Sequence, residues 1–481
     1  MTLLHTAVHA VESKPNILWI IGDDLGDELG CYGYSMAHTP NMDRLAGEGI
    51  RYPNAFATAP VCSASRSAFI TGMYQTRIGC QDHRTMLMKP LPDGIHPITT
   101  YLRAAGYTCV DVVGLGANGK EDFNFRPADV FDSKDLAVME NAVTEGKPLF
   151  AQVNFFEPHR KFTRLPTDEQ GADPAKVTLP PLYPDNPIAR KDWAEYLDAV
   201  HVCDDKVGRL LTWLDEQHLA ENTVIFLFGD NGRPHVWDKQ WLSDAGLRVP
   251  LIVRWPGRVK PGTVDKRLVS LIDVSAETLV AAGVGPLPTM DGRPFIGPDT
   301  RSRDYVFGAR DRCGEAFDRI RSVHDERYNY IRNYYPEMPY WQRSRYKEKE
   351  YPVFTLLKQL HTEGKLSPPQ DRFFADTKPA EELYDLETDP GELHNLAPDP
   401  AHAPVLERFR QALERWQNEV PDAGAIPESS KEYNLAAEHS QKQYPTVKSD
   451  EWDTRTDTIV EALKARRFQP TSTAHLNAVK P

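Results

Sequence analysis

The chain has 481 residues, a formal net charge of −13, 40% hydrophobic residues and 26% charged residues. This length predicts two unequal domains of ordinary globular composition. The acidic balance argues against a nucleic-acid-binding protein, and the absence of an apolar run of about 18 residues argues against a membrane-spanning helix.

Residues 1–13, MTLLHTAVHAVES, lack the basic start and the full apolar core of a signal peptide. Val8-His9-Ala10 resembles a cleavage site only loosely. We interpret a signal peptide as absent or trimmed in this sequence, and the compartment stays open at this stage.

Apolar, β-rich runs then alternate with amphipathic stretches. The predicted strands are 16–24, 106–114, 148–159, 222–232 and 248–257. The predicted helices lie within 39–57, where Met42, Leu45 and Ala46 have helical spacing, and at 193–217 and 274–284. This alternation predicts an α/β sandwich with a mainly parallel central sheet.

Polar clusters follow these strands, where ligands of parallel sheets bind. They are Asp23-Asp24, Glu157 to His159, and Asp230-Asn231. Four oxygen ligands from two strand ends suit calcium or magnesium far better than zinc. A helix cap or solvated turn would also explain the paired aspartates, and a plain turn would explain Asn231 before a glycine.

The stretch PVCSASRSAFITG places Cys62 and Arg66 among small hydroxyl residues. Cys62 could be a core residue, a metal ligand, a redox partner or a nucleophile. The chain has six cysteines and no CxxC pair, so disulfide, redox and zinc interpretations are weak.

Several basic residues also follow strands, although any one of them is more often a solvated surface residue. The set is Arg66, Lys120, Lys239 and Arg233, with His159 and His235 in nearby motifs. Their shared position predicts an anion-binding site, while His159 could equally be a core histidine.

The composition changes at about Asp304, where aromatic and basic stretches begin. We predict a catalytic domain over 14–304 and a smaller α+β subdomain over 305–481. The last fifty residues are polar, which favours an irregular tail on the surface.

CSASR before ITG resembles the type I sulfatase signature, whose cysteine a maturation enzyme converts to formylglycine. NILWIIGDDLG is similar to the opening strand of that family, and GDNG to its second metal cluster. The block from Lys239 to RWPG and the stretch ELYDLETDPGELHNLA resemble two later signatures. The resemblance spans 15 to about 396 and implies an alkaline-phosphatase-like sandwich.

The resemblance also implies a mechanism for Cys62. One hydroxyl of the hydrated aldehyde would attack sulfur, and the other would later expel sulfate as the carbonyl forms again. A divalent cation, usually calcium in the family and with magnesium as the alternative, would activate the hydroxyl and neutralise charge. Arg66 would hold the hydrate and its loop.

Further roles carry over residue by residue. The implied metal ligands are Asp23, Asp24, Asp230, Asn231 and modified Cys62. Lys120 resembles the lysine that binds the sulfate group of the substrate in that family. His159 and Lys239 resemble the pair that binds sulfate and protonates the departing oxygen.

Asp122 departs from the commoner pattern, in which a histidine contacts the formylglycine. Asp122 could be a base for the second step, or it could cap a turn or pair with Lys120 or Arg126. GKEDFNF, GCQDHR and GRPHVWDKQW resemble a bacterial branch labelled heparan N-sulfatase-like. That resemblance implies substrate contacts by His83, Arg84, Arg233 and His235.

The sequence therefore predicts a sulfatase acting on a sulfated carbohydrate, with a maturation enzyme as partner and a periplasmic or secreted location. One alternative is a phosphodiesterase or phosphonate monoester hydrolase on the same scaffold. Another is a sulfatase-like binding protein whose Cys62 stays unmodified. Sugar identity, and N-sulfate against O-sulfate, stay open.

Overall fold

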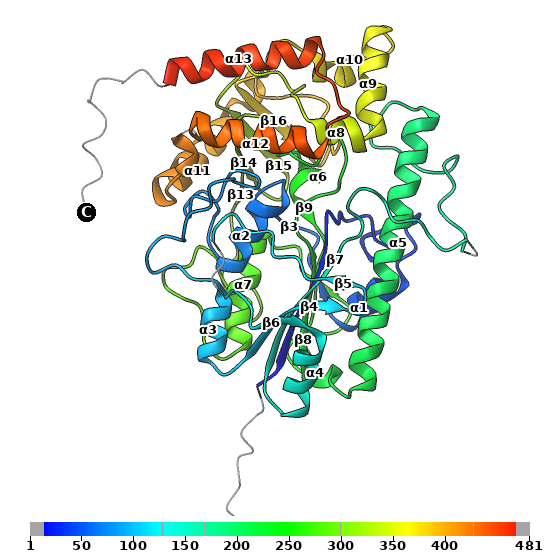
Figure 1. Ribbon diagram of the computed structural model, residues 1–481, viewed down its shortest axis with the longest axis vertical. Helices are drawn as coiled ribbons and strands as arrows, with labels where there is room; N and C mark the ends of the chain where they lie inside the picture. The colour runs from blue at the N-terminus through cyan, green and yellow to red at the C-terminus, as the bar shows by residue number, and fades with distance from the viewer. Residues whose placement is uncertain (1–13, 127–128, 168, 299, 427, 468–481) are drawn as a thin grey trace, which may run out of the picture.

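A computed structural model gives the structure of residues 14–126, 129–167, 169–298, 300–426 and 428–467 (Figure 1). The loosely matched cleavage site at Val8-His9-Ala10 lies outside these residues. No helix of the described chain is long and apolar enough to cross a membrane.

The described chain contains a large mixed sheet in the order β11-β2-β10-β8-β1-β7-β4-β5, with β6 beside β4. Its strands are β1 (Asn16–Gly22), β2 (Ile50–Arg51), β4 (Thr108–Gly114), β5 (Ala117–Asn118), β6 (Ser133–Asp135), β7 (Leu149–Phe155), β8 (Thr223–Gly229), β10 (Leu251–Arg254) and β11 (Thr263–Val264). The central strands β8, β1, β7 and β4 are parallel. The predicted α/β class with a mainly parallel central sheet is confirmed.

Helices cover both faces of this sheet (Figure 1). They are α1 (Pro40–Glu48), α2 (Cys62–Thr71), α3 (Ile98–Ala104), α4 (Leu136–Thr144), α5 (Pro187–Glu216) and α7 (Leu271–Ala281), while the short α6 (Asp244–Leu247) packs in a separate apolar cluster through Leu247. The helices α2, α3 and α7 pack on one face, and α1, α4 and α5 pack on the other.

Strand β1 shows why the sheet is buried on both sides. Its residues Ile17, Trp19 and Ile21 enter one core, while Leu18 and Ile20 enter the other. Because side chains alternate along a strand, a continuous apolar run buries both faces. The sandwich predicted from these runs follows directly from this alternation.

A second, antiparallel sheet has the order β13-β14-β15-β16. Its strands are β13 (Val306–Arg310), β14 (Ile320–His324), β15 (Tyr328–Asn333) and β16 (Glu381–Asp385). A small third sheet joins β12 (Val269–Ser270), β3 (Ala55–Phe56) and β9 (Arg248–Val249). The antiparallel sheet begins just after Asp304, and the domain boundary there stays a prediction.

The later helices surround the antiparallel sheet (Figure 1). They are α8 (Arg345–Glu350), α9 (Pro352–Thr362), α10 (Pro368–Asp371), α11 (Ala403–Glu419), α12 (Ser430–Gln443) and α13 (Glu451–Arg467). Short 3-10 turns occupy Gly30–Tyr32, Ala220–Asn222, Arg372–Phe374, Pro400–His402 and Ala423–Ala425. Residues 430–443 and 451–467 are thus helical, where the polar composition favoured an irregular tail. Tyr433 and Val460 anchor these helices in a small apolar cluster.

Replacing Phe150 with alanine should lower the free energy of unfolding by about 3–5 kcal/mol. Phe150 is fully buried in β7, and its ring centre lies 5.1 Å from that of Trp19. Urea unfolding followed by circular dichroism measures the change. Val113→Ala, at a side chain 49% exposed, is the control and should stay within about 0.5 kcal/mol of the parent. Equal losses in both variants would contradict the two-faced core.

Candidate active site

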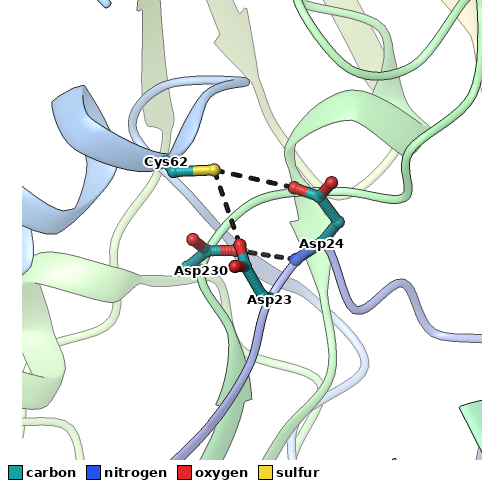
Figure 2. A group of neighbouring side chains, drawn as sticks. All are labelled: Asp23, Asp24, Cys62 and Asp230. Carbon is teal, nitrogen blue, oxygen red and sulfur yellow. Dashed lines mark hydrogen bonds between the residues drawn. The ribbon is translucent and has the colours of Figure 1, made fainter. Parts of the chain in front are cut away.

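Three carboxylates and a thiol meet at the carboxyl ends of β1 and β8 (Figure 2). Asp23 and Asp24 follow β1, Asp230 follows β8, and Cys62 opens α2. One ligand atom from each of the four lies within 4.8 Å of the others, and all four residues are buried. The structure thus brings together side chains that are up to about two hundred positions apart in the chain.

The register of β1 against β8, and the close approach of the backbone after these strands, bring the four side chains together. Gly22 pairs with Gly229, so the residues after both strands are neighbours. Asp24 has a φ of 64°, which non-glycine residues rarely adopt, and its N–H donates to Asp230 Oδ1 at 2.9 Å. A Cβ atom on Gly229 would lie 2.1 Å from the Leu25 carbonyl oxygen, so the turn requires glycine there.

Arg66 is fully buried and holds the end of β8. Its Nε donates to Asp230 Oδ2 at 2.8 Å, and one terminal nitrogen donates to Asn154 Oδ1 at 2.5 Å. The other terminal nitrogen is buried without a protein partner. Asn154 belongs to β7, where a polar residue inside an apolar run was the signal that sequence reasoning missed.

Two lysines compensate the other two carboxylates. Lys120 Nζ donates to both oxygens of Asp23, at 2.8 and 2.7 Å. Lys239 Nζ donates to both oxygens of Asp24, at 2.7 and 2.6 Å. Burial opposes charge on Asp23 and Asp24, but these ammonium groups outweigh it and lower the pKa of both carboxyls. The carboxylates of Asp23 and Asp24 are therefore ionised.

The Cys62 thiol lies beside this cluster without a disulfide. Its Sγ is 3.5 Å from Asp23 Oδ1 and 3.6 Å from Lys239 Nζ. Burial raises the pKa of the Cys62 thiol well above its ordinary value, so the sulfur stays protonated. All six cysteines are free. The unmodified thiol is therefore a poor nucleophile in this setting.

The donor set fits a hard divalent cation. Asn231 Nδ2 donates to Asp24 Oδ1 at 2.8 Å, while Asn231 Oδ1 is buried without a hydrogen-bond partner among the residues that the structure describes. An unpaired buried acceptor costs free energy unless a donor or a cation meets it. Carboxylate and amide oxygens are the ligands that calcium and magnesium prefer.

A cavity of about 340 Å³ opens beside the cluster. Of the predicted site residues, His83, Arg84, His159 and Lys239 line it. Other lining residues come from the C-terminal half: Arg312, Gly314, Glu315, Ser344, Tyr346, Glu350, Ala436, His439, Ser440, Gln443 and Tyr444. The cavity therefore has walls from both halves of the chain.

His159 connects the cavity with the acidic cluster. Its Nε2 lies 3.8 Å from Asp24 Oδ2, and its Nδ1 contacts the Arg160 carbonyl oxygen. Burial and the nearby Lys239 ammonium lower the pKa of His159 to about 4, so the imidazole is neutral at pH 7. It could accept a proton, or donate one from the nitrogen that carries it.

Asp122 forms an ion pair with Arg84, at 3.0 Å from Nη2 to Oδ2, and lies 3.8 Å from Lys120 Nζ. Desolvation opposes its charge, but Arg84 and Lys120 outweigh this effect and lower the pKa of Asp122. Such a carboxylate is a weak base, so the geometry favours the ion-pair role over the base role. Arg126, its other predicted partner, donates instead to the Met88 carbonyl oxygen.

Arg233 and His235 lie outside this cavity, although sequence reasoning placed them at the substrate. Arg233 pairs with Glu28 and with Asp238. His235 is buried, stacks on Trp193 and lies 3.6 Å from Asp192 Oδ2. Arg233 is thus held by two ion pairs, and His235 by aromatic packing and the nearby Asp192 carboxylate.

Lys347 of α8 was missed, since nothing in the sequence links it to Lys239. Its ammonium is buried and donates to the carbonyl oxygens of Val236 and Lys239, at 3.0 Å each. Burial lowers the pKa of Lys347 to about 7. Next to it, the Tyr346 ring centre lies 5.9 Å from Lys239 Nζ. The C-terminal half thus holds the backbone that carries Lys239.

Comparison with known proteins identifies two family profiles. The profile described as "Sulfatase" matches residues 15–284. The profile described as "N-sulphoglucosamine sulphohydrolase, C-terminal" matches residues 232–349. The chain is also 32% identical over 464 residues to an ulvan-active sulfatase of Formosa agariphila, which covers 86% of this chain and 77% of that protein.

Solved structures show the same fold at low sequence identity. A 2-O GAG sulfatase superposes with a TM-score of 0.63 at 19% identity and covers 88% of this chain and 96% of its own. A phosphonate monoester hydrolase from Silicibacter pomeroyi superposes with a TM-score of 0.62 at 18% identity and covers 86% and 97%. These likenesses confirm the predicted alkaline-phosphatase-like sandwich.

Calcium or magnesium should raise the thermal unfolding midpoint of the protein. At a free ion concentration about 100 times the dissociation constant, binding adds about 2.7 kcal/mol to stability. Asn231→Ala removes one oxygen ligand and should shrink the shift. Asn141→Ala, exposed on α4, is the matched control and should respond like the parent. A shift equally large in Asn231→Ala would exclude Asn231 as a ligand.

Proposed function

The chain belongs to the sulfatase family, and from that premise we propose that it hydrolyses the sulfate ester or N-sulfate of a sulfated carbohydrate. The observation that carries the proposal is the position of Cys62, at the start of α2 and beside three buried carboxylates. Membership alone would fit an inactive relative, but a buried cysteine within this charge arrangement supports a reaction centre.

Substrate class is supported by the cavity and by the relatives. Arg84, Lys161 and Lys239 give the cavity cationic side chains, which favour an anionic ligand. One relative is named for activity on ulvan, and one matching profile is named for N-sulphoglucosamine. We therefore place a sulfated sugar in this cavity.

A phosphonate monoester or phosphodiester substrate is the main alternative. It rests on fold likeness at 18% identity, whereas the sulfatase profile matches more than half of the chain. Turnover of aryl sulfates against aryl phosphodiesters separates the two. The binding-protein alternative requires an unmodified thiol, which the mass of the peptide containing Cys62 detects.

We propose that Cys62 is converted to formylglycine by a separate maturation enzyme. The conversion oxidises Cβ by two electrons and replaces the thiol sulfur with an aldehyde oxygen, and the maturation reaction would have to supply an oxidant and remove the sulfur. When hydrated, the aldehyde supplies one hydroxyl to attack sulfur and a second whose deprotonation forms the carbonyl again and releases sulfate. Arg66, buried one helical turn after Cys62, would fix the orientation of this group.

A cation held by Asp23, Asp24, Asp230 and Asn231 would lower the pKa of a hydroxyl and neutralise sulfate charge, with calcium the family's usual ion. The remaining roles belong to this chain's own side chains. Lys120 and Lys239 are placed to bind sulfate oxygens, since their ammonium groups lie at the cluster. Lys239, and His159 once it has gained a proton, are placed to protonate the departing sugar oxygen.

A periplasmic or extracellular location would suit a substrate that is a polymer outside the cell. This location stays our expectation from the family. Cell fractionation of the native host tests it.

Cys62→Ala should abolish turnover of aryl and sugar sulfates, because a methyl group cannot form an aldehyde hydrate. The measurement is sulfate release by protein produced in a host that carries the maturation enzyme. Cys31→Ala, at a free cysteine outside the cluster, is the control and should keep activity. Turnover by folded Cys62→Ala above a trace would refute the formylglycine mechanism.

His159→Ala and Lys239→Ala should each lower the rate by roughly a hundredfold or more, the usual effect of losing a positioned acid or charge stabiliser. The loss should shrink along a series of aryl sulfates as the leaving group improves, because a good leaving group needs less protonation. Rates measured across that series give the slope. An equal loss for every leaving group would restrict both residues to sulfate binding.

A further inference from the structure

The helix α12 supplies part of the wall of the candidate active-site cavity, and it packs beside α8 (Figure 1). Five residues of this stretch line the cavity: Ala436, His439, Ser440 and Gln443 of the helix, and Tyr444 directly after it. Residues three and four positions apart lie on one face of a helix, so these five form a single row, here called the α12 stripe. The matching family profiles cover 15–284 and 232–349, so neither assigns a role to the stripe.

The α12 stripe is polar, yet it contains no Lys, Arg, Asp or Glu. The charged residues of the helix lie outside the cavity lining: Lys431, Glu432, Glu438 and Lys442. An imidazole, a hydroxyl and a primary amide form hydrogen bonds without a full charge, and together they both donate and accept. Sugar hydroxyls also donate and accept, whereas a sulfate group only accepts and is bound more strongly by cationic donors. The composition of the stripe therefore suits the sugar ring better than the sulfate.

The polar side chains of the stripe are open to a ligand. His439 and Gln443 are exposed, and Ser440 is partly buried. In the part of the chain that the structure describes, none of these three side chains forms a hydrogen bond or an ion pair with another residue. A ligand in the cavity can therefore bind them without breaking a contact inside the protein.

Contacts with the rest of the C-terminal half hold α12 in place. Tyr433 packs in the apolar cluster that contains Val460, and its hydroxyl donates to the Glu315 carbonyl oxygen at 3.2 Å. At the start of the helix, Ser429 and Glu432 form a capping box. Because the wall is held before a ligand arrives, binding to it costs less conformational entropy.

Two ring contacts connect the stripe with the candidate reaction centre. The Tyr444 ring centre lies 6.1 Å from that of Tyr346, and the Tyr346 ring centre lies 6.1 Å from that of His159. His159 Nε2 in turn lies 3.8 Å from Asp24 Oδ2. His159 and Lys239 line the same cavity as the stripe. A ligand whose charged group lies at Lys239 can thus extend its uncharged part toward α12.

We infer that the α12 stripe is a specificity-determining surface of the candidate active site. It binds the hydroxyl groups of the sugar unit that carries the sulfate, with His439 and Gln443 as the principal hydrogen-bonding residues. This inference rests on the proposed function and adds to it the side chains that select the sugar. A site built to pair with substrate hydroxyls discriminates against a substrate that lacks them.

The test compares 4-nitrophenyl sulfate, which has no sugar hydroxyls, with galactose 6-sulfate, glucose 6-sulfate and N-sulfoglucosamine. Sulfate release by the matured, full-length protein gives kcat/KM for each compound. Gln443→Ala and His439→Ala should each lower the ratio of kcat/KM for the best sugar sulfate to kcat/KM for the aryl sulfate about threefold to tenfold, which is the effect of one hydrogen bond. Gln441→Ala removes the same side chain from the same helix outside the cavity, so it is the matched control and should keep the parent's ratio.

The outcomes separate this inference from the proposed function. A parent that hydrolyses the aryl sulfate but none of the three sugar sulfates would overturn the inference and leave the sulfatase chemistry standing. The parent's ratio in both α12 variants, or an equal fall in Gln441→Ala, would overturn it as well. A parent that hydrolyses neither class would refute the proposed function, and the inference with it. Because both rates scale with the amount of folded enzyme, a partial folding defect cancels from the ratio.

Discussion

Three carboxylates buried at one end of a parallel sheet impose the constraint on which the rest of the site depends. A buried charge is costly unless a cation or a metal compensates it. Each of Asp23, Asp24 and Asp230 therefore has its own cationic partner, and each partner comes from a different element. Arg66 is supplied by α2, while the two lysines are supplied by loops. The path of the chain around β1 and β8 is thus tied to charge balance as much as to apolar packing.

The C-terminal half of the chain contributes contacts to the site that forms at the end of the central sheet. Lys347 fixes the carbonyl oxygen of Lys239, and residues of α12 form part of the cavity wall. The sheet carries the acidic cluster, and the later helices add part of the cavity wall beside it, so a ligand in this cavity would contact both halves of the chain.

The segment 232–245 presents different side chains to two cavities. Lys239 and Gln240 line the cavity beside the acidic cluster, and Trp237 and Trp241 line a second cavity with a mainly aromatic wall. The backbone of this segment is held from α8, because Lys347 binds two of its carbonyl oxygens. Both cavities therefore border the same short, buried stretch of chain.

The sequence by itself determined the α/β class and the metal-ligand candidates, because local patterns encode them, whereas only the resemblance to the sulfatase family singled out Cys62 as the nucleophile precursor. Apolar runs such as 16–22 predict buried strands, and polar residues after a parallel strand must lie at the ligand-binding edge. Only the tertiary structure decided which cations pair with which carboxylates. Asn154, Lys347 and α12 reach the site from distant parts of the chain, and no spacing rule connects them. Arg233 and His235 do not line the cavity beside Lys239, and their substrate contacts stay a prediction, because adjacency in sequence does not determine the direction of a side chain.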